Sequence, residues 1–328
     1  MNENLMPKLR ATQQTIVFIL FLVMFGGFLL LLPGFAQLDN LLTLLQNVAI
    51  LGILGLGMAV VVIGRGIDIS MIAALAVPSG FLLQSVSNGQ SIEVAALQAL
   101  VLTLMFGLIN GWLVAYAEVP SLFTTLASGL FLAGLGQAVI FQLEVVQWPQ
   151  ALDAMVWIGR GSVAGIPMPV LMFGLASALM ALLLRRMRAG AFIYAIGDNP
   201  FTARATGLPT RPIILLEYLL AGLIGLFAGL VMAASVNSMP TRIYNSTMVY
   251  DVVLVVVLGG IGLSGGRGGV VNVIIGTLLI GTMLNGMTIM DISYSVQNII
   301  KGLVLLTAIL IDSVLNPRNE ETAQQGDI

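Results

Sequence analysis

The shortage of charged residues constrains this chain more than any other feature of its sequence. Only 9% of its 328 residues are Asp, Glu, Lys or Arg, and 58% are hydrophobic, whereas an ordinary soluble domain carries about 25% charged residues. The charges stand in short islands between long apolar runs. Roughly 20 apolar helical residues cross the hydrocarbon core of a bilayer, which is about 30 Å thick. The sequence therefore predicts an all-α, polytopic membrane helix bundle.

Apolar windows of this length recur along the whole chain, and no break in composition marks a separate soluble domain. We predict a single transmembrane domain over residues 1–328. The windows 41–63 and 69–88 are separated only by Arg65 and Asp68, so a re-entrant segment there, giving nine or eleven crossings, is the alternative. Our prediction is about ten spans, at 14–33, 41–63, 69–88, 94–117, 120–143, 164–184, 212–235, 247–264, 269–290 and 292–312.

The placement of Lys and Arg predicts the orientation, because cytoplasmic loops of membrane proteins carry an excess of positive charge. With the amino terminus inside, two basic residues, Arg160 and Arg242, fall on the outer side. Both termini are therefore predicted to be cytoplasmic. The basic residues on the inner side are Lys8, Arg10, Arg65, Arg185, Arg186, Arg188, Arg204, Arg211, Arg267 and Arg318.

The residue types that are missing exclude several kinds of chemistry. The chain has no Cys and no His, so it has no disulfide, thiolate nucleophile, histidine metal site or histidine base. Gly260–Gly265 fits the pattern G-x-G-x-x-G, but the next carboxylate is Asp291 and no Gly-Lys-Ser/Thr occurs, as a dinucleotide site or a P-loop would need. We predict a chain that is not an enzyme, has no catalytic, metal or cofactor-binding residue, and binds no nucleic acid, since its basic residues are too scattered.

The loop 185–211, between the sixth and seventh spans, carries the sharpest local signal. Residues 197–207 predict a short helix, because Asn199 is a good N-cap, Pro200 suits the first turn and Gly207 can end a helix in the left-handed conformation. A two-turn helix cannot stand alone in water, so it packs on its own bundle or on another protein, such as a separate ATPase. On composition alone a simple surface helix is the favoured interpretation. The candidate ATPase-coupling residues are Asn199, Pro200, Phe201, Arg204 and Gly207.

Polar and ionisable residues in or near the spans are the candidates for the pathway or its gate. Lys301 lies near the middle of the last span, where it either pairs with a carboxylate or carbonyl or faces a wet pathway. Asp68 lies at a membrane edge, where it can anchor a loop. Amides inside spans mostly bridge helices. The predicted pathway or gating residues are Asp68, Asn110, Asn285 and Lys301.

Two segments in the two halves of the chain echo each other. Val60–Ser70 reads VVVIGRGIDIS and Val255–Ser264 reads VVVLGGIGLS. The echo reflects either duplicated halves, a common plan of transporters, or two Gly-rich turns that are alike by chance.

The stretch Gly64–Ser70 also resembles the G-G-I-D-L-S element of permease subunits in bacterial ATP-binding-cassette importers for ribose and similar simple sugars. Arg65 departs from that pattern where a second glycine is usual, and Pro200 stands where an acidic residue is frequent. Further elements that resemble this family, in family order, are Asn110–Gly111, Val119–Leu126, Gly197–Gly207, Leu258–Gly269 and Val296–Asp312 with its Lys301.

The resemblance implies a permease in the bacterial inner membrane that imports a pentose, hexose or related polyol. ATP and Mg²⁺ would bind to a cytoplasmic ATPase that docks on the loop 185–211. The other implied partners are a second permease, identical or a paralogue, and an external sugar-binding protein. The same architecture could serve a branched-chain amino acid, a nucleoside or a signalling sugar. An ion-coupled secondary carrier is a weaker alternative, because no row of acidic residues crosses the spans.

Overall fold

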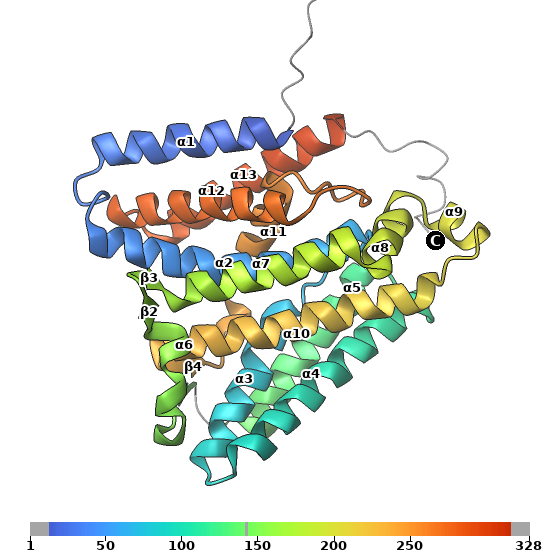
Figure 1. Ribbon diagram of the computed structural model, residues 1–328, viewed down its shortest axis with the longest axis horizontal. Helices are drawn as coiled ribbons and strands as arrows, with labels where there is room; N and C mark the ends of the chain where they lie inside the picture. The colour runs from blue at the N-terminus through green and yellow to red at the C-terminus, as the bar shows by residue number, and fades with distance from the viewer. Residues whose placement is uncertain (1–12, 142–143, 316–328) are drawn as a thin grey trace, which may run out of the picture.

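The computed structural model describes residues 13–141 and 144–315, and within them the chain is a bundle of helices with two short β-ribbons (Figure 1). Each predicted window contains one apolar helix, which confirms the all-α membrane bundle. Three of these helices have an apolar stretch shorter than a full membrane crossing. They are α3 (Met71–Ser87), α11 (Met248–Leu258) and α13 (Tyr294–Leu315), of which the apolar part is Tyr294–Leu310. The seven that are long and apolar enough to cross a membrane are α1 (Gln13–Leu31), α2 (Leu38–Ile63), α4 (Ile92–Ala115), α5 (Ser121–Leu135, continued by the π-helical turn Gly136–Ile140), α7 (Met168–Arg186), α10 (Thr210–Val236) and α12 (Val270–Ile289).

The predicted span 247–264 is wrong in its extent. Helix α11 ends at Leu258, because Gly259 and Gly260 close it, with Gly260 at φ +90°. At 1.5 Å per residue its 11 residues are about 16 Å long, roughly half the thickness of a hydrocarbon core. α11 is therefore a half-helix, preceded and followed by non-helical backbone.

Short elements occupy the two ends of the bundle. At one end, β1 (Val145–Gln147) pairs antiparallel with β4 (Ser238–Pro240), and β2 (Ser162–Val163) with β3 (Ile166–Pro167). The same region holds the 3₁₀ turns Gln150–Met155 and Ile243–Asn245 and the short α6 (Trp157–Arg160). At the other end of the bundle lie α8 (Arg188–Asp198) and α9 (Pro200–Ala205) (Figure 1).

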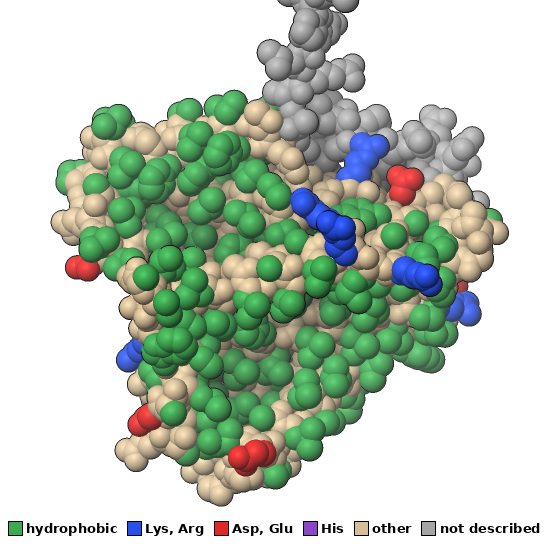
Figure 2. All heavy atoms as spheres, viewed as in Figure 1, with side chains coloured by type: hydrophobic (Ala, Val, Ile, Leu, Met, Phe, Trp, Pro, Cys, Tyr) green, Lys and Arg blue, Asp and Glu red, His purple; other side chains and the backbone are tan. Residues whose placement is uncertain are grey.

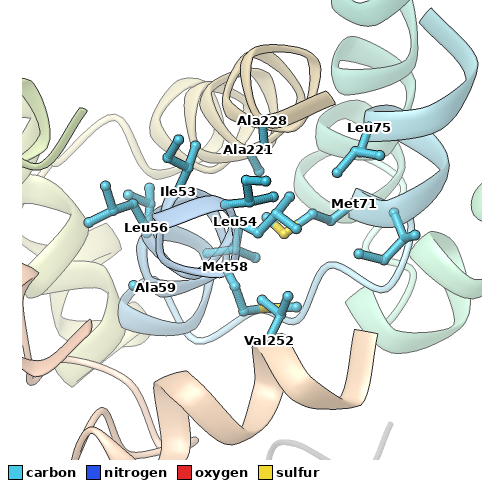
Figure 3. Packing of buried hydrophobic residues seen from close by; sticks show 14 of the residues in the cluster. Ile53, Leu54, Leu56, Met58, Ala59, Met71, Leu75, Ala221, Ala228 and Val252 are labelled. Carbon is cyan, nitrogen blue, oxygen red and sulfur yellow. The ribbon is translucent and has the colours of Figure 1, made fainter. Parts of the chain in front are cut away.

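Helix α2 forms the centre of the bundle. In its most apolar window 89% of the residues are buried inside the protein, and α10, α12, α7 and α11 all pack against it. Figure 3 shows Ile53, Leu54 and Met58 of α2 between Ala221 of α10 and Val252 of α11. A helix buried on all sides can be apolar all round. The run from Val48 to Ile63 contains only apolar residues and glycine.

Charge is distributed unevenly between the two ends. In Figure 2 the Lys and Arg side chains gather mainly at the end that carries α8 and α9, and the middle of the bundle is covered by apolar side chains. The described chain also begins and ends on that side, at the start of α1 and the end of α13 (Figure 1). Which of the two ends faces the cytoplasm stays a prediction; Lys8, Arg10 and Arg318, which entered that prediction, lie outside the described residues.

Candidate functional site

The short helix predicted in the loop 185–211 is present as α9. The Asn199 side-chain oxygen accepts hydrogen bonds from the backbone N–H groups of Phe201 and Thr202, both at 3.0 Å. Pro200 opens the helix and Gly207 follows it at φ +80°, so cap, first turn and end are as predicted. Phe201 remains half exposed, which leaves an apolar side chain at the surface of this end of the bundle.

Arg204 of α9 contacts the rest of the protein through Glu118, which follows α4. Its guanidinium lies 3.6 Å from the Glu118 carboxylate, and Arg211 at the start of α10 lies 3.5 Å from the same oxygen. All three side chains are about half exposed, so each pair contributes at most about 1 kcal/mol. These contacts orient α9 without fixing it.

Helix α8 was missed by the sequence analysis, and it connects α9 to the bundle. Its last turn packs against backbone: a Cβ at Gly197 would overlap the carbonyl oxygen of Ile63 and the N–H of Gly266. The Gly266 N–H itself donates to the Ile63 carbonyl at 2.8 Å. One turn earlier, the Tyr194 hydroxyl donates to the Gly268 carbonyl at 2.7 Å. We call this meeting of α8 with the turns after α2 and α11 the α8 junction.

The two echoed segments have the same hydrogen-bond pattern. After α2, the N–H of Arg65 donates to Val62 and that of Gly66 to Val61. After α11, the N–H of Gly260 donates to Val257 and that of Ile261 to Val256 in the same spacing. Both are Schellman caps, which need a left-handed residue at their centre. Gly260 fills it with φ +90°, whereas in the first cap Arg65 does so with φ +74°.

Asp68 and Asn110, two of the predicted pathway residues, lie in one buried cluster. The Ser70 hydroxyl donates to the Asp68 carboxylate at 2.5 Å and accepts from the Asn110 amide at 2.8 Å. Asp68 lies in the turn between α2 and α3, where burial raises the pKa of its carboxyl to about 6, against the lowering effect of Ser70. The cluster ties that turn to α4.

A buried carboxylate beside this cluster was overlooked in the sequence, although it lies inside a predicted span. Glu217 of α10 is only 1% exposed, and its carboxyl group packs against Gly64 so closely that a Cβ there would overlap it. One of its oxygens has no hydrogen-bond partner among the described residues. The next residue, Tyr218, likewise packs its hydroxyl against Gly66. The turn after α2 is therefore packed against α10 through polar groups.

Lys301 pairs with a carboxylate, the first of its two predicted alternatives. Its ammonium nitrogen lies 2.9 Å from Asp251 in the first turn of α11 and donates to the Thr247 hydroxyl at 2.8 Å. Only 6% of the Lys301 side chain and 14% of the Asp251 side chain are exposed. Asp251 lies inside the predicted span 247–264 and was also overlooked. The pair joins α13 to the start of the half-helix.

Asn285, the fourth predicted pathway residue, binds another amide. Asn285 and Asn40 donate to each other's carbonyl oxygens at 2.9 and 3.1 Å, and Asn40 also donates to the Phe35 carbonyl. The interaction joins α12 to the start of α2. The structure thus brings Asp68 and Asn110 together and places Asn285 and Lys301 in two separate contacts.

These features define a class of protein before any comparison. A bundle of membrane-crossing helices that includes a half-helix with a buried ion pair at its start is typical of membrane transport proteins. Among the described residues no group of carboxylates could hold a metal ion.

Comparison with known proteins agrees with this class. The chain belongs to the family described as "Branched-chain amino acid transport system / permease component", which matches residues 40–309. It is therefore a permease component, a multi-pass membrane subunit of a transport system.

Individual relatives cover most of the chain. Ribose import permease protein RbsC of Escherichia coli (strain K12) is 31% identical over 283 residues, which are 86% of this chain and 88% of that protein. RbsC of Bacillus subtilis (strain 168) is 33% identical over 85% of this chain and 86% of its own length. Xylose transport system permease protein XylH of Haemophilus influenzae is 30% identical over 84% and 88%. No solved structure was found to match the chain.

Proposed function

We propose that this chain is the membrane permease of an ATP-driven importer for a simple sugar in a bacterial inner membrane. The observation that carries the proposal is the identity of 30–33%, over more than four fifths of the chain, to proteins named as ribose and xylose permeases. The solute is a pentose, a hexose or a related polyol. The partners are a second permease, an external sugar-binding protein and a cytoplasmic ATPase, which binds ATP and Mg²⁺.

The end of the bundle with α8 and α9 supports docking of that ATPase. There the capped α9 leaves Phe201 half exposed, with Arg204 beside it, and α8 links this surface to the turns after α2 and α11. A displacement of α9 would therefore reach both turns through the α8 junction. We propose that Asn199, Pro200 and Gly207 maintain the shape of this helix, while Phe201 and Arg204 contact the ATPase.

The same architecture could import a branched-chain amino acid, as the family description allows. Uptake separates the alternatives. Proteoliposomes that contain the permease, its ATPase and its binding protein should accumulate labelled D-ribose or D-xylose, and not L-leucine, when ATP is supplied. They should not respond to a protonophore. Accumulation of a pentose by the permease without ATPase would refute the ATP-driven mechanism. ATP-driven uptake of leucine and of no sugar would refute the assignment of a sugar as the solute.

The coupling role has its own test. A cysteine introduced at Phe201 should crosslink to the ATPase. The chain contains no other cysteine, so any crosslink from this chain comes from that position. A cysteine at Val163, exposed at the opposite end of the bundle, is the matched control. Crosslinking at Val163 and not at Phe201 would reverse the proposed orientation.

A further inference from the structure

The half-helix α11 is too short to cross a membrane by itself. Its last turn meets Gly276 near the start of α12, at the end of the bundle that carries α8. Since α11 is about 16 Å long, it can cover at most about half of a hydrocarbon core, and other backbone must cross the remaining depth. The residues before α11, 241–247, are non-helical apart from the short turn Ile243–Asn245.

Non-helical backbone at this depth is tolerated only where it is buried in protein or lines a water-filled cavity. Two tyrosines at the start of α11 and α13 are not buried: Tyr250 is 57% exposed and Tyr294 is 58% exposed. Hydrogen-bonding groups lie beside Tyr294, and Tyr250, on α11, follows Thr247 by three residues. The Tyr294 hydroxyl lies 2.9 Å from the Thr247 hydroxyl, which also donates to the Asn298 side-chain oxygen at 3.2 Å. This surface, made of Thr247, Tyr250, Tyr294 and Asn298, is here called the α11–α13 surface.

Charge at the α11–α13 surface is neutralised within the protein. Lys301 and Asp251 pair with each other beneath it at 2.9 Å, and Lys301 also donates to Thr247. What remains on the surface is two aromatic rings, hydroxyl groups and an amide. A zwitterionic amino acid would need a charged partner for its carboxylate or ammonium group, since burying an unpaired charge is costly. A neutral solute with many hydroxyl groups needs only hydrogen bonds and an aromatic ring.

A cavity lies next to Tyr250 of this surface, between α2, α5, α11 and α13. It has a volume of about 250 Å³, and its walls are apolar apart from Tyr250. Ile67 and Leu263, from the segments that follow the two Schellman caps, line it as well. A solute at Tyr250 would therefore share this cavity with the segments that follow the two caps, and the apolar walls can act as a barrier to water and ions.

From this geometry we propose that the α11–α13 surface is a contact site for the transported solute inside the permease, and that it selects a neutral polyhydroxylated molecule. Tyr250 supplies a ring face and a hydroxyl, and Asn298 supplies its amide. Asp251 and Lys301 are positioning residues that hold the two helices together. The inference that the solute is neutral and polyhydroxylated rests on the proposed function. The inference that the surface is exposed to water does not depend on it.

Cysteine labelling tests the exposure without knowledge of the solute. Full-length variants Tyr250→Cys, Asn298→Cys and Ile299→Cys each carry a single cysteine, because the native chain has none. Ile299 is a matched control: it is 62% exposed at the same depth of α13 but belongs to its apolar stripe with Leu303 and Leu306. A membrane-impermeant maleimide reacts only with a hydrated thiolate, so Tyr250→Cys and Asn298→Cys should react at least about tenfold faster than Ile299→Cys. Equal rates at the three positions, or no reaction at Tyr250→Cys, would overturn the proposal.

Protection and uptake test the solute class. D-ribose or D-xylose, whichever the native transporter accumulates, should slow labelling of Tyr250→Cys during ATP-driven turnover. Tyr250→Ala and Asn298→Ala should raise KM for that sugar at least about tenfold, the loss of one or two hydrogen bonds, while Ile299→Ala leaves it unchanged. If the native transporter accumulates no pentose, hexose or related polyol, the proposed function fails even when the surface labels. If it accumulates one and both alanine variants keep the native KM, the proposed function stands and this inference fails.

Discussion

The ion pair between Asp251 and Lys301 allows the sharpest prediction. Lys301→Met leaves the Asp251 carboxylate buried without its cation, and Asp251→Asn leaves the ammonium group without its anion. Breaking a buried pair in this way costs about 3–5 kcal/mol. Thr247 accepts a hydrogen bond from Lys301 at 2.8 Å and cannot replace the lost charge. Each single variant should therefore lower the free energy of unfolding by about that amount, and should reduce sugar uptake.

The double variant Asp251→Asn/Lys301→Met removes both charges together. Replacement of a buried pair by neutral residues is often neutral or stabilising, so the double variant should be within about 1 kcal/mol of the native chain. The coupling between the two sites should then be several kcal/mol, far above the roughly 0.5 kcal/mol expected of independent sites. Reversible unfolding of the purified permease in mixed detergent micelles, titrated with SDS, measures all four free energies.

Two results would refute this reasoning. If Lys301→Met is as stable as the native chain, the pair contributes nothing to the fold. If the double variant is as unstable as the worse single variant, the two side chains do not compensate each other. Uptake distinguishes a further case: a double variant that folds normally but transports nothing would show that Lys301 contacts the solute directly rather than positioning α11.

Three further changes test other contacts. Asn199→Ala removes the cap of α9 and should cost about 1 kcal/mol of local stability, seen as faster amide exchange in α9 and weaker ATPase binding; unchanged exchange would contradict the capping role. Arg65→Gly places glycine at the left-handed position of the first Schellman cap and should stabilise the permease by about 1 kcal/mol in the SDS titration, and a loss of stability would argue against strain there. Gly197→Ala forces a methyl group into the Ile63 carbonyl and should uncouple ATP hydrolysis from uptake or destabilise the fold. The control Gly174→Ala has open space around it and should be neutral or stabilising by up to about 1 kcal/mol. If the two variants behave alike, the α8 junction is not part of the coupling route.

The sequence was sufficient where a signal is local. Apolar runs predict the helices because hydrocarbon requires them, and Asn199, Pro200 and Gly207 predict α9 because each satisfies a terminal backbone group on its own. The end of α11 could also have been predicted from the pair Gly259–Gly260. The predicted span was too long because apolar residues follow that pair.

Long-range pairing could not be predicted in this way. Asp251 and Lys301 are 50 residues apart, and neither residue indicates its partner; Glu217 was overlooked because its window is otherwise apolar. The buried residues Gly190, Ile193 and Ile196 of α8 are three residues apart, as on one face of a helix. That periodicity could have predicted this helix. The α8 junction could not have been found, since it depends on helix α8 meeting two distant turns in space.

The central position of α2 has a consequence for biosynthesis. A ribosome makes this helix early, yet α10 and α12, which pack against it, follow Ile63 by roughly 150 residues or more. At 5–20 residues per second that interval is about seven seconds or longer. During it, a helix destined to be almost wholly enclosed must reside in lipid or be held by the insertion machinery. Polar substitutions on α2 would therefore act first on membrane insertion, before any finished transporter exists to be impaired.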